Sequence, residues 1–177
     1  MVMSRTFRSA GLAAAGVKEK DPGNAYYSFF SPRRLDAEVI KDSVNFLANE
    51  DYERSVYQKV IRNKLDPFLT TFNLPIPTTT ISKRDSTNIP AQALSMMNGE
   101  FVQTASRQWA HRLIQATQGV SVAGKIDAFF WDAYGRSANE KEQEQLKDYF
   151  DSIDEFDTAM ENIAFALMNT KEFMYLY

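Results

Sequence analysis

The sequence contains no cysteine, a single histidine and only seven glycines among its 177 residues. Without cysteine the chain cannot form disulfides, iron–sulfur clusters, thiolate zinc sites or a c-type haem attachment, and it has no cysteine nucleophile. His111 alone cannot supply the several imidazole ligands of the usual zinc and copper sites. The phosphate-cradling loops G-x-x-x-x-G-K and G-x-G-x-x-G are also missing. The sequence therefore predicts no metal site and no cofactor.

Long apolar runs and clustered positive charge are missing as well. No stretch reaches the roughly 18 apolar residues of a membrane-spanning helix, so no membrane span is predicted. The net charge of −3 divides into +4 over residues 1–112 and −7 over residues 113–177. A weakly positive half lacks the clustered basic face of a nucleic-acid binder, so no binding to nucleic acid is predicted. Opposite charge on the two halves favours attraction between them.

Apolar and aromatic residues are abundant, with 44% apolar residues, 13 Phe, 8 Tyr and 2 Trp. A chain of this length can bury roughly 70% of its extended surface without any staple. The sequence predicts one domain over residues 1–177, with an irregular, mixed segment over 1–89 and a helical segment over 90–177.

Two similar signals organise the first segment. Ser31-Pro32 is a typical helix start, and the apolar spacing after it predicts a helix over 32–48. Asp66-Pro67 repeats the signal and predicts a short helix over 67–73. Residues 55–61 are rich in β-prone side chains and form the best strand candidate. Prolines and β-branched residues predict extended backbone over 74–81, within a long irregular connection over 74–88. This connection could be a functional loop or a structural crossover; the crossover is favoured.

Helical spacing dominates from residue 90 onward. Pro90 begins a helix that Asn98-Gly99 interrupts, and a later helix is closed by Gly135. The stretch Ser137-Ala138-Asn139-Glu140 matches a capping box at the start of the next helix. Because the connections are short, neighbouring helices are expected to be antiparallel. The predicted fold is mainly α, with four to five such helices packed on an irregular half that has one helix and, as an option, a short strand pair.

No arrangement of side chains identifies a catalytic site. His111 is interpreted as a surface or half-buried histidine, and no G-x-S-x-G elbow accompanies it. The acidic run from Asp148 to Asp157 lacks the spacing and central glycine of an EF-hand, so it is interpreted as solvated charge near helix ends. No catalytic residue and no metal ligand are predicted, and the sequence favours a chain that is not an enzyme.

Polar and aromatic side chains of the first half remain as a candidate binding site. If they converge, they form an Arg-rich cluster able to hold an anion or a sugar. Arg34 and Glu38 are spaced i, i+4 and could pair along the predicted helix. The same groups could make a buried structural network, which is the favoured interpretation. The set is Arg33, Arg34, Glu38, Arg54, Tyr57, Arg62, Asn63, Arg84, Asn88 and Gln92.

Short motifs occur along the chain in the order found in one protein family. They are Ser4-Arg5-Thr6-Phe7, Pro32-Arg33-Arg34-Leu35, Ala37-Glu38-Val39-Ile40, Arg54-Ser55-Val56-Tyr57, Arg62-Asn63, Pro90 with Gln92-Ala93-Leu94, Met97-Asn98, Phe101-Val102, Tyr134-Gly135-Arg136 and the stretch Leu167-Met168-Asn169-Thr170-Lys171-Glu172-Phe173. On these motifs the chain resembles the C-terminal domain of unknown function, numbered fifteen fifty-three, of large planctomycete-type proteins that often carry a cytochrome module. The resemblance spans nearly the whole chain. It implies neighbouring domains and a periplasmic or cell-envelope setting, but no established activity.

The chain departs from that family in two ways. It lacks the haem-binding C-x-x-C-H, so no cytochrome function is implied. It also begins near the Ser4-Arg5-Thr6 element, which predicts a truncated or split member. The first functional hypothesis is a non-catalytic structural or interaction domain of a larger envelope-associated protein, with the upstream family region, neighbouring domains or a second copy as partner. The alternative is a carbohydrate-related binding or hydrolytic module that uses the Arg and aromatic cluster.

Overall fold

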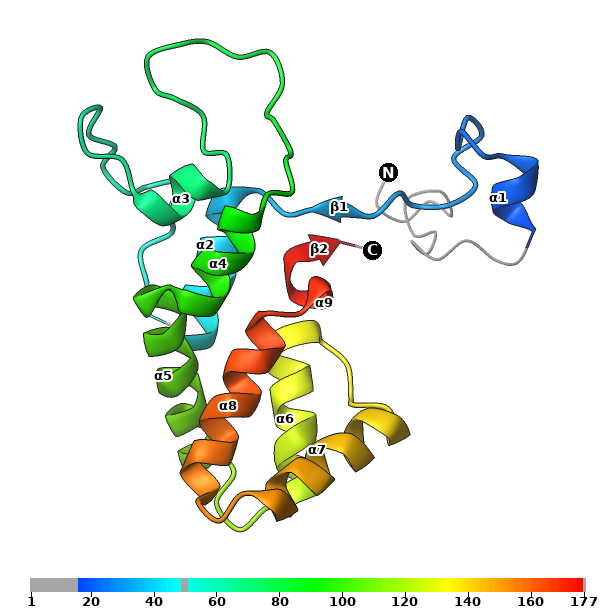
Figure 1. The fold of residues 1–177 in the computed structure, drawn as a ribbon, viewed down its shortest axis with the longest axis vertical. Coiled ribbons are helices and arrows are strands. Elements are labelled where there is room, and N and C mark those ends of the chain that lie inside the picture. Colours follow the sequence, from blue (N-terminus) through cyan, green and yellow to red (C-terminus); the bar gives the residue numbers. More distant parts are fainter. Residues whose placement is uncertain (1–15, 49–50, 177) are drawn as a thin grey trace. The chain divides into compact units, whose positions relative to one another are not determined.

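The computed structural model describes residues 16–48 and 51–176, and it is mainly α-helical, which confirms the predicted fold class (Figure 1). Its contacts divide the chain into two compact units, one made of Met1–Leu35 with Met174–Tyr177 and the other of Asp36–Phe173. The single domain over residues 1–177 stays a prediction. The first family motif, at residues 4–7, lies outside the described residues.

A short antiparallel strand pair characterises the first unit. β1 (Arg33–Arg34) pairs with β2 (Tyr175–Leu176), and the Leu35 N–H donates to the Met174 carbonyl at 2.9 Å. The predicted helix over 32–48 is therefore wrong at its start. The local Ser31-Pro32 signal fails because the backbone beside it is extended and pairs with the distant C-terminal segment, a contact that local sequence does not encode.

Residues 21–28 of the first unit form turns. After α1 (Val17–Lys20), the Asp21 carboxylate accepts hydrogen bonds from the Ala25 N–H, the Tyr26 N–H and the Ser28 hydroxyl at 2.7, 3.1 and 2.8 Å. These bonds fix the turn that begins at Asp21. Tyr26 and its neighbour Tyr27 are both left strongly exposed.

The second unit begins with an amphipathic helix. α2 (Ala37–Ala48) buries Ile40, Val44 and Leu47, which lie four and three residues apart and therefore share one face. This face packs against α5 (Glu100–Ala116). Val39 and Phe46 lie off that face and remain about half exposed.

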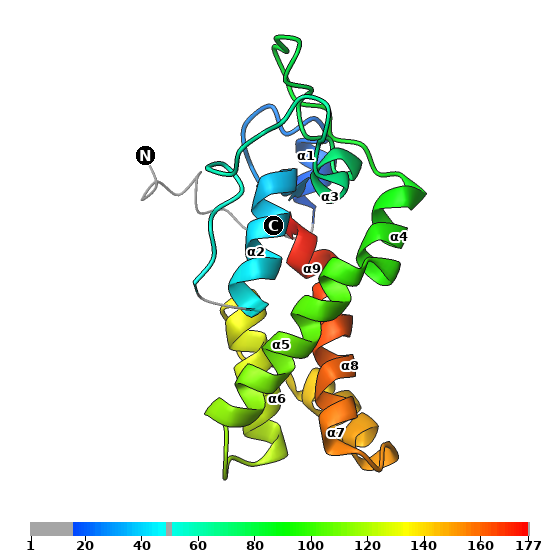
Figure 2. The same ribbon diagram turned by 90° about the vertical axis from the view of Figure 1, so that its left-hand side faces the viewer.

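The core of the second unit lies between α5 and α8 (Phe156–Met168), which are side by side in Figures 1 and 2. Trp109 of α5 is fully buried and packs edge-on against Phe129 of α6 (Val122–Tyr134), with ring centroids 4.9 Å apart. Its indole N–H donates to Asp132 Oδ2 at 3.0 Å. The buried indole therefore has the hydrogen-bond partner that its burial requires.

Two short helices flank a long loop. α3 (Pro67–Thr71) is capped as predicted, because the Asp66 side chain accepts the Leu69 N–H at 3.0 Å. α4 (Pro90–Asn98) begins at the predicted proline. Residues 74–89 between them have no helix or strand, which confirms the predicted irregular connection; we call them the long loop. It projects from the helices in Figure 1.

The predicted strand over residues 55–61 is wrong. Hydrogen bonds from Tyr57 N–H to the Arg54 carbonyl at 2.9 Å and from Gln58 N–H to the Ser55 carbonyl at 3.3 Å make turns there. Ile61 forms only an isolated bridge with Lys64. A β-prone stretch needs a neighbouring strand to complete its hydrogen bonds, and residues 16–48 and 51–176 provide none beside it.

α7 (Glu140–Ser152) starts with a capping box, but not the predicted one. Asn139 caps the helix and exchanges hydrogen bonds with Glu142, at 3.0 Å from the Glu142 N–H and 2.8 Å from the Asn139 N–H. Ser137 lies two residues before this cap and does not serve as one. Its hydroxyl accepts the Trp131 indole N–H instead. α9 (Lys171–Met174) follows α8 and leads to β2.

Candidate functional site

The predicted site residues are divided between the two compact units. Arg33 and Arg34 lie in β1, in the first unit, and the other eight lie in the second unit. Arg34 cannot pair with Glu38 along a helix as predicted, because Arg34 is in extended backbone and α2 begins at Ala37. The i, i+4 spacing that suggested this pair has meaning only inside a helix.

Glu38 is instead held by Arg84, 46 residues further along. Arg84 Nη1 and Nη2 donate to the two Glu38 carboxylate oxygens at 2.6 and 2.9 Å. Burial opposes the charged form of Glu38, but the hydrogen bonds and charge of Arg84, together with a backbone hydrogen bond, outweigh it and hold the pKa of Glu38 below its usual value. The same contact raises the pKa of Arg84. This fork ties the long loop to the first turn of α2.

Gln92 ties the end of the long loop to α3. Its side chain is buried, and its amide N–H donates to the Thr71 carbonyl at 3.0 Å and to the Thr87 hydroxyl at 3.3 Å. The Thr87 hydroxyl also donates to Asn73 Oδ1 at 2.9 Å. Asn88, another predicted site residue, is exposed beside this network. Gln92 therefore acts in the structural network that the sequence favoured.

A third set of contacts fixes the segment between α2 and α3. Lys41 Nζ donates to Asp66 Oδ2 at 2.6 Å and to Gln58 Oε1 at 3.1 Å. Burial opposes the charge on Asp66, but Lys41 and the capping N–H outweigh it and lower the pKa of Asp66. The Asp42 carboxylate accepts both the N–H and the hydroxyl of Ser55, at 2.8 and 2.6 Å. These contacts hold Ser55, Gln58 and Asp66 against α2.

We call residues 54–64 the basic loop. It contains four cations and no carboxylate, and all four cations are exposed: Arg54, Lys59, Arg62 and Lys64. Among the described residues none of the four forms a salt bridge. Four large apolar or aromatic side chains are also exposed on it, at 50–74% of their surface: Val56, Tyr57, Val60 and Ile61. The loop thus presents positive charge and apolar surface together.

A hollow of about 370 Å³ lies beside the basic loop. It is lined from the loop by Lys59, Val60 and Ile61 and from α3 by Leu69. Arg54, Tyr57, Arg62 and Asn63 belong to the loop but do not line the hollow. Of the predicted cluster, the structure therefore keeps these four together on one exposed loop and uses Glu38, Arg84 and Gln92 as anchors.

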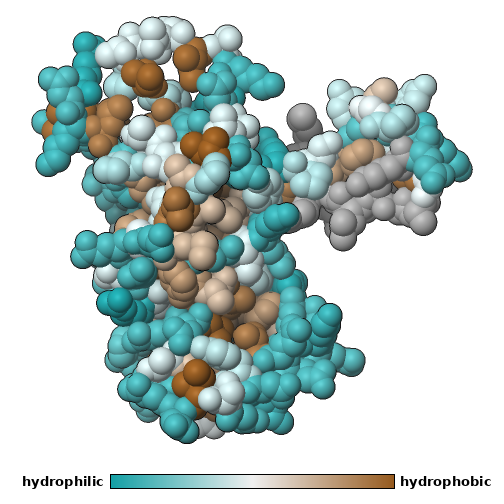
Figure 3. Space-filling view, viewed as in Figure 1, coloured by the Kyte–Doolittle hydropathy of each residue, from teal (hydrophilic) through white to brown (hydrophobic). Residues whose placement is uncertain are grey.

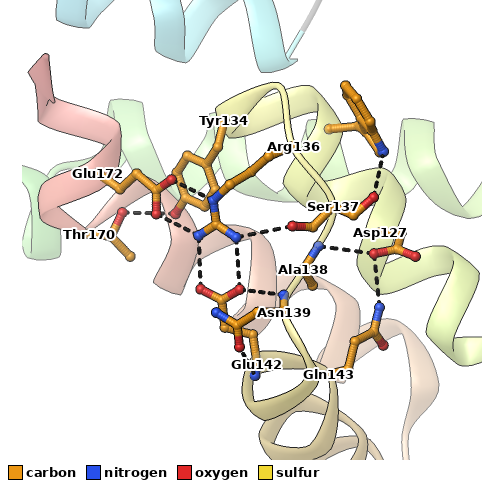
Figure 4. Close-up of polar contacts among 11 residues, drawn as sticks. Asp127, Tyr134, Arg136, Ser137, Ala138, Asn139, Glu142, Gln143, Thr170 and Glu172 are labelled. Carbon is orange, nitrogen blue, oxygen red and sulfur yellow. Dashed lines mark hydrogen bonds and ion pairs between the residues drawn. The ribbon is translucent and has the colours of Figure 1, made fainter. Parts of the chain in front are cut away.

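A second polar centre, around Arg136, was not among the predicted site residues (Figure 4). Arg136 Nε and Nη2 donate to the two Glu172 oxygens, both at 2.7 Å, and Nη1 and Nη2 donate to the two Glu142 oxygens at 2.8 and 2.9 Å. Nη1 also donates to the Ser137 carbonyl at 3.1 Å. A guanidinium has five N–H groups, and all five are used here. No donor remains for a ligand, so this centre is a structural clamp.

The environment of the clamp shifts several pKa values. The hydrogen bonds from Arg136 lower the pKa of Glu142, and the two carboxylates raise that of Arg136. Burial raises the pKa of Tyr134 to about 12. Its hydroxyl donates to the Leu167 carbonyl at 3.0 Å and lies 2.8 Å from the Thr170 hydroxyl. Tyr134 therefore stays protonated and links the end of α6 to the turn between α8 and α9.

A signal for the clamp was present in the sequence. Two of the quoted motifs, Tyr134-Gly135-Arg136 and the stretch over 167–173, contain four of its residues, and the structure brings them together. Gly135 ends α6 with a φ of 68°, a left-handed conformation that glycine adopts without steric cost. That turn directs Arg136 back toward α9.

Within residues 16–48 and 51–176, no group of three or more His, Asp or Glu side chains is arranged to hold a metal ion. No helix in the same residues is long and apolar enough to cross a membrane. His111 is exposed on α5, with Nε2 3.7 Å from Glu161, as the sequence indicated.

Comparison with known proteins gives one match. A family model described as PSD1, a protein of unknown function (DUF1553), matches residues 45–150. No curated protein matches the chain. No solved structure matches it either. The matched range contains both the basic loop and most of the clamp.

Proposed function

Because the chain belongs to the PSD1 family of proteins of unknown function, we propose that it is a non-catalytic interaction domain of a larger, envelope-associated protein. The planctomycete-type relatives that its motifs resemble are large, so the partner is expected among neighbouring domains, the upstream family region or a second copy. The basic loop is the interaction surface.

The observation that carries this proposal is that the basic loop exposes large apolar side chains while neighbouring residues of the loop are hydrogen-bonded to α2. Val56 and Tyr57 are 65% and 74% exposed, although each apolar Å² kept in water forgoes about 25 cal/mol of burial. Ser55 and Gln58, on either side of them, are hydrogen-bonded to Asp42 and Lys41. A surface that is already ordered loses less entropy on binding, which favours association.

The use of the charged groups supports an interaction role over catalysis. Glu38, Asp66 and Glu142 are the described carboxylates of the second unit whose pKa departs clearly from its usual value. In all three the pKa is lowered by a protein cation, whereas a general acid or base near neutral pH needs a raised carboxylate pKa. These groups therefore act as ionised structural anchors.

Site-specific photo-cross-linking tests the proposal. A photoreactive residue placed at Tyr57 of the full chain, in the cells that make it, is expected to give discrete cross-linked products. The matched control is the same residue at Lys141, an exposed position on α7. Products at position 57 that do not exceed those at position 141 would contradict an interaction role for the basic loop.

Carbohydrate binding remains the second candidate, and one observation favours it. Tyr57 is strongly exposed on the same loop as the exposed Arg54 and Arg62, so a ring face and two guanidinium groups are available to a sugar. Hydrolysis is less well supported than binding, because a glycosidase uses a pair of carboxylates and the basic loop has none. Titration calorimetry with envelope polysaccharide, comparing the native chain with Tyr57→Ala, tests it. Equal heats for both would exclude a role for Tyr57.

A further inference from the structure

The second unit carries a surface opposite in charge to the basic loop. We call residues 148–157 the acidic turn; it connects α7 to α8 and contains no lysine or arginine. Its five carboxylates are all exposed: Asp148, Asp151, Asp154, Glu155 and Asp157. Within the described chain none of the five forms a salt bridge. The basic loop, with four cations, and the acidic turn, with five carboxylates, thus carry opposite charges of similar magnitude.

Apolar surface accompanies the acidic charge. Phe156 of the acidic turn is 39% exposed although it stacks on Phe150, and Val120 is 44% exposed. Lys125 contacts the residues on both sides. Its Nζ lies 5.6 Å from the Phe156 ring centre and donates a hydrogen bond to the carbonyl of Thr117, three residues before Val120. Charge and exposed apolar side chains therefore occur together here, as they do on the basic loop.

The two surfaces lie at opposite ends of the second unit. In Figures 1 and 2 the connection between α2 and α3, which contains the basic loop, is at one end, and the connection between α7 and α8 is at the other. Figure 3 shows apolar atoms among hydrophilic ones at both ends. The basic loop and the acidic turn of one copy cannot meet, so each surface is available to another molecule.

We infer that the basic loop of one copy docks on the acidic turn of a second copy, head to tail. This rests on the proposed function, in which the basic loop is an interaction surface, and it identifies the partner. Charge complementarity sets the orientation, and the hollow lined by Val60, Ile61 and Leu69 gives the partner's apolar side chains a place to bury. In a head-to-tail arrangement each copy keeps one unused surface, so the association repeats and builds chains or rings.

Two charge-reversed variants of the full chain test the inference. Lys59→Glu with Arg62→Glu changes the charge of the basic loop from +4 to 0, and Asp151→Lys with Asp154→Lys changes that of the acidic turn from −5 to −1. Each is expected to weaken self-association by more than about tenfold, because most of the charge attraction between the two surfaces is then removed. The control, Lys141→Glu with Lys171→Glu, changes net charge as much as the loop variant does, at exposed sites outside both surfaces.

An equimolar mixture of the two variants is the decisive sample. The unchanged acidic turn of one variant meets the unchanged basic loop of the other, so association is expected to return. Sedimentation equilibrium gives the mean mass. For the native chain it should rise with concentration at about 0.01 M ionic strength and fall to the monomer at about 1 M, where the screening length shrinks from about 30 to about 3 Å.

Three results would overturn the inference: a monomeric native chain at low ionic strength, full association of either variant alone, or a mixture that stays monomeric. If the native chain binds anionic lipid vesicles and not itself, the occupant is a membrane surface and the inference is wrong. The proposed function is tested separately, by the cross-linking experiment at Tyr57. Cross-links from position 57 to another protein would keep the interaction role even where the purified chain is monomeric.

Discussion

Arg136 and Glu172 form a two-point ion pair, with Nε and Nη2 each 2.7 Å from a carboxylate oxygen. They are 36 residues apart, one in the turn after α6 and the other in α9. With Glu142 on the other side of the guanidinium, the pair makes α6, α7 and α9 depend on one side chain. One of these helices, α7, leads at its other end into the acidic turn.

Arg136→Ala is expected to lower the free energy of unfolding by about 2–3 kcal/mol, since two carboxylates lose their partner in a half-buried setting. Arg136→Lys should lose nearly as much, because an ammonium cannot form both forks. Urea unfolding measures both. The control is Arg107→Ala, where an exposed arginine lies 4.0 Å from Glu161 and a change within about 0.5 kcal/mol is expected. Equal losses at both positions would contradict the clamp.

Replacing Glu142 with Gln is expected to remove part of the acid sensitivity of the fold. The pKa of Glu142 is lowered in the folded state from its ordinary value of 4.5, so its ionised form stabilises the fold above that value and is lost as the pH falls through the folded pKa. The stability difference between native chain and variant should therefore be full at about pH 7 and shrink toward about pH 3. A difference that stays constant over this range would show that Glu142 does not act through its charge.

Glu38→Gln is expected to release the long loop with little effect on the helices. Loss of the charged contact with Arg84, discounted for the partial exposure of that arginine, corresponds to about 1 kcal/mol and about fivefold more loop opening. Trypsin cleavage after Lys83 should accelerate by that factor. Asp85→Asn, an exposed change on the same loop, should leave the cleavage rate unaltered. The anchoring role is wrong if both variants are cut at the native rate.

Gly135→Ala is expected to cost about 1–2 kcal/mol, because alanine is strained at a φ of 68° even though nothing lies within 4 Å of an added Cβ. The same substitution at Gly23 also meets no neighbour and has no such backbone strain. Thermal unfolding of the two variants separates backbone strain from crowding. A larger loss at Gly23 would contradict the assignment.

The sequence predicted the helical elements well because their signals are local. Asp66 and Pro67 identified the start of α3, and Gly135 identified the end of α6. The irregular long loop followed from its prolines. These features depend on residues a few positions apart, and such signals survive whatever packs around them.

The errors have a common cause in long-range pairing. Arg33 and Arg34 follow a good helix signal but pair with Tyr175 and Leu176, and Tyr57 lies in a β-prone stretch that has no strand beside it. The partners of Glu38 and Arg136, 46 and 36 residues away, could not be read from spacing either. The predicted Arg and aromatic site therefore separates into anchors and one exposed loop.

Hydroxyl-radical footprinting of Tyr57 tests the central claim, that the basic loop is an interaction surface, most directly. Tyr57 is 74% exposed in the single chain, and Trp131, at 58%, is the internal control. The account predicts that Tyr57 is labelled several-fold less in cells than in the dilute purified chain, while Trp131 is labelled equally in both. Equal labelling of Tyr57 in the two samples would contradict it.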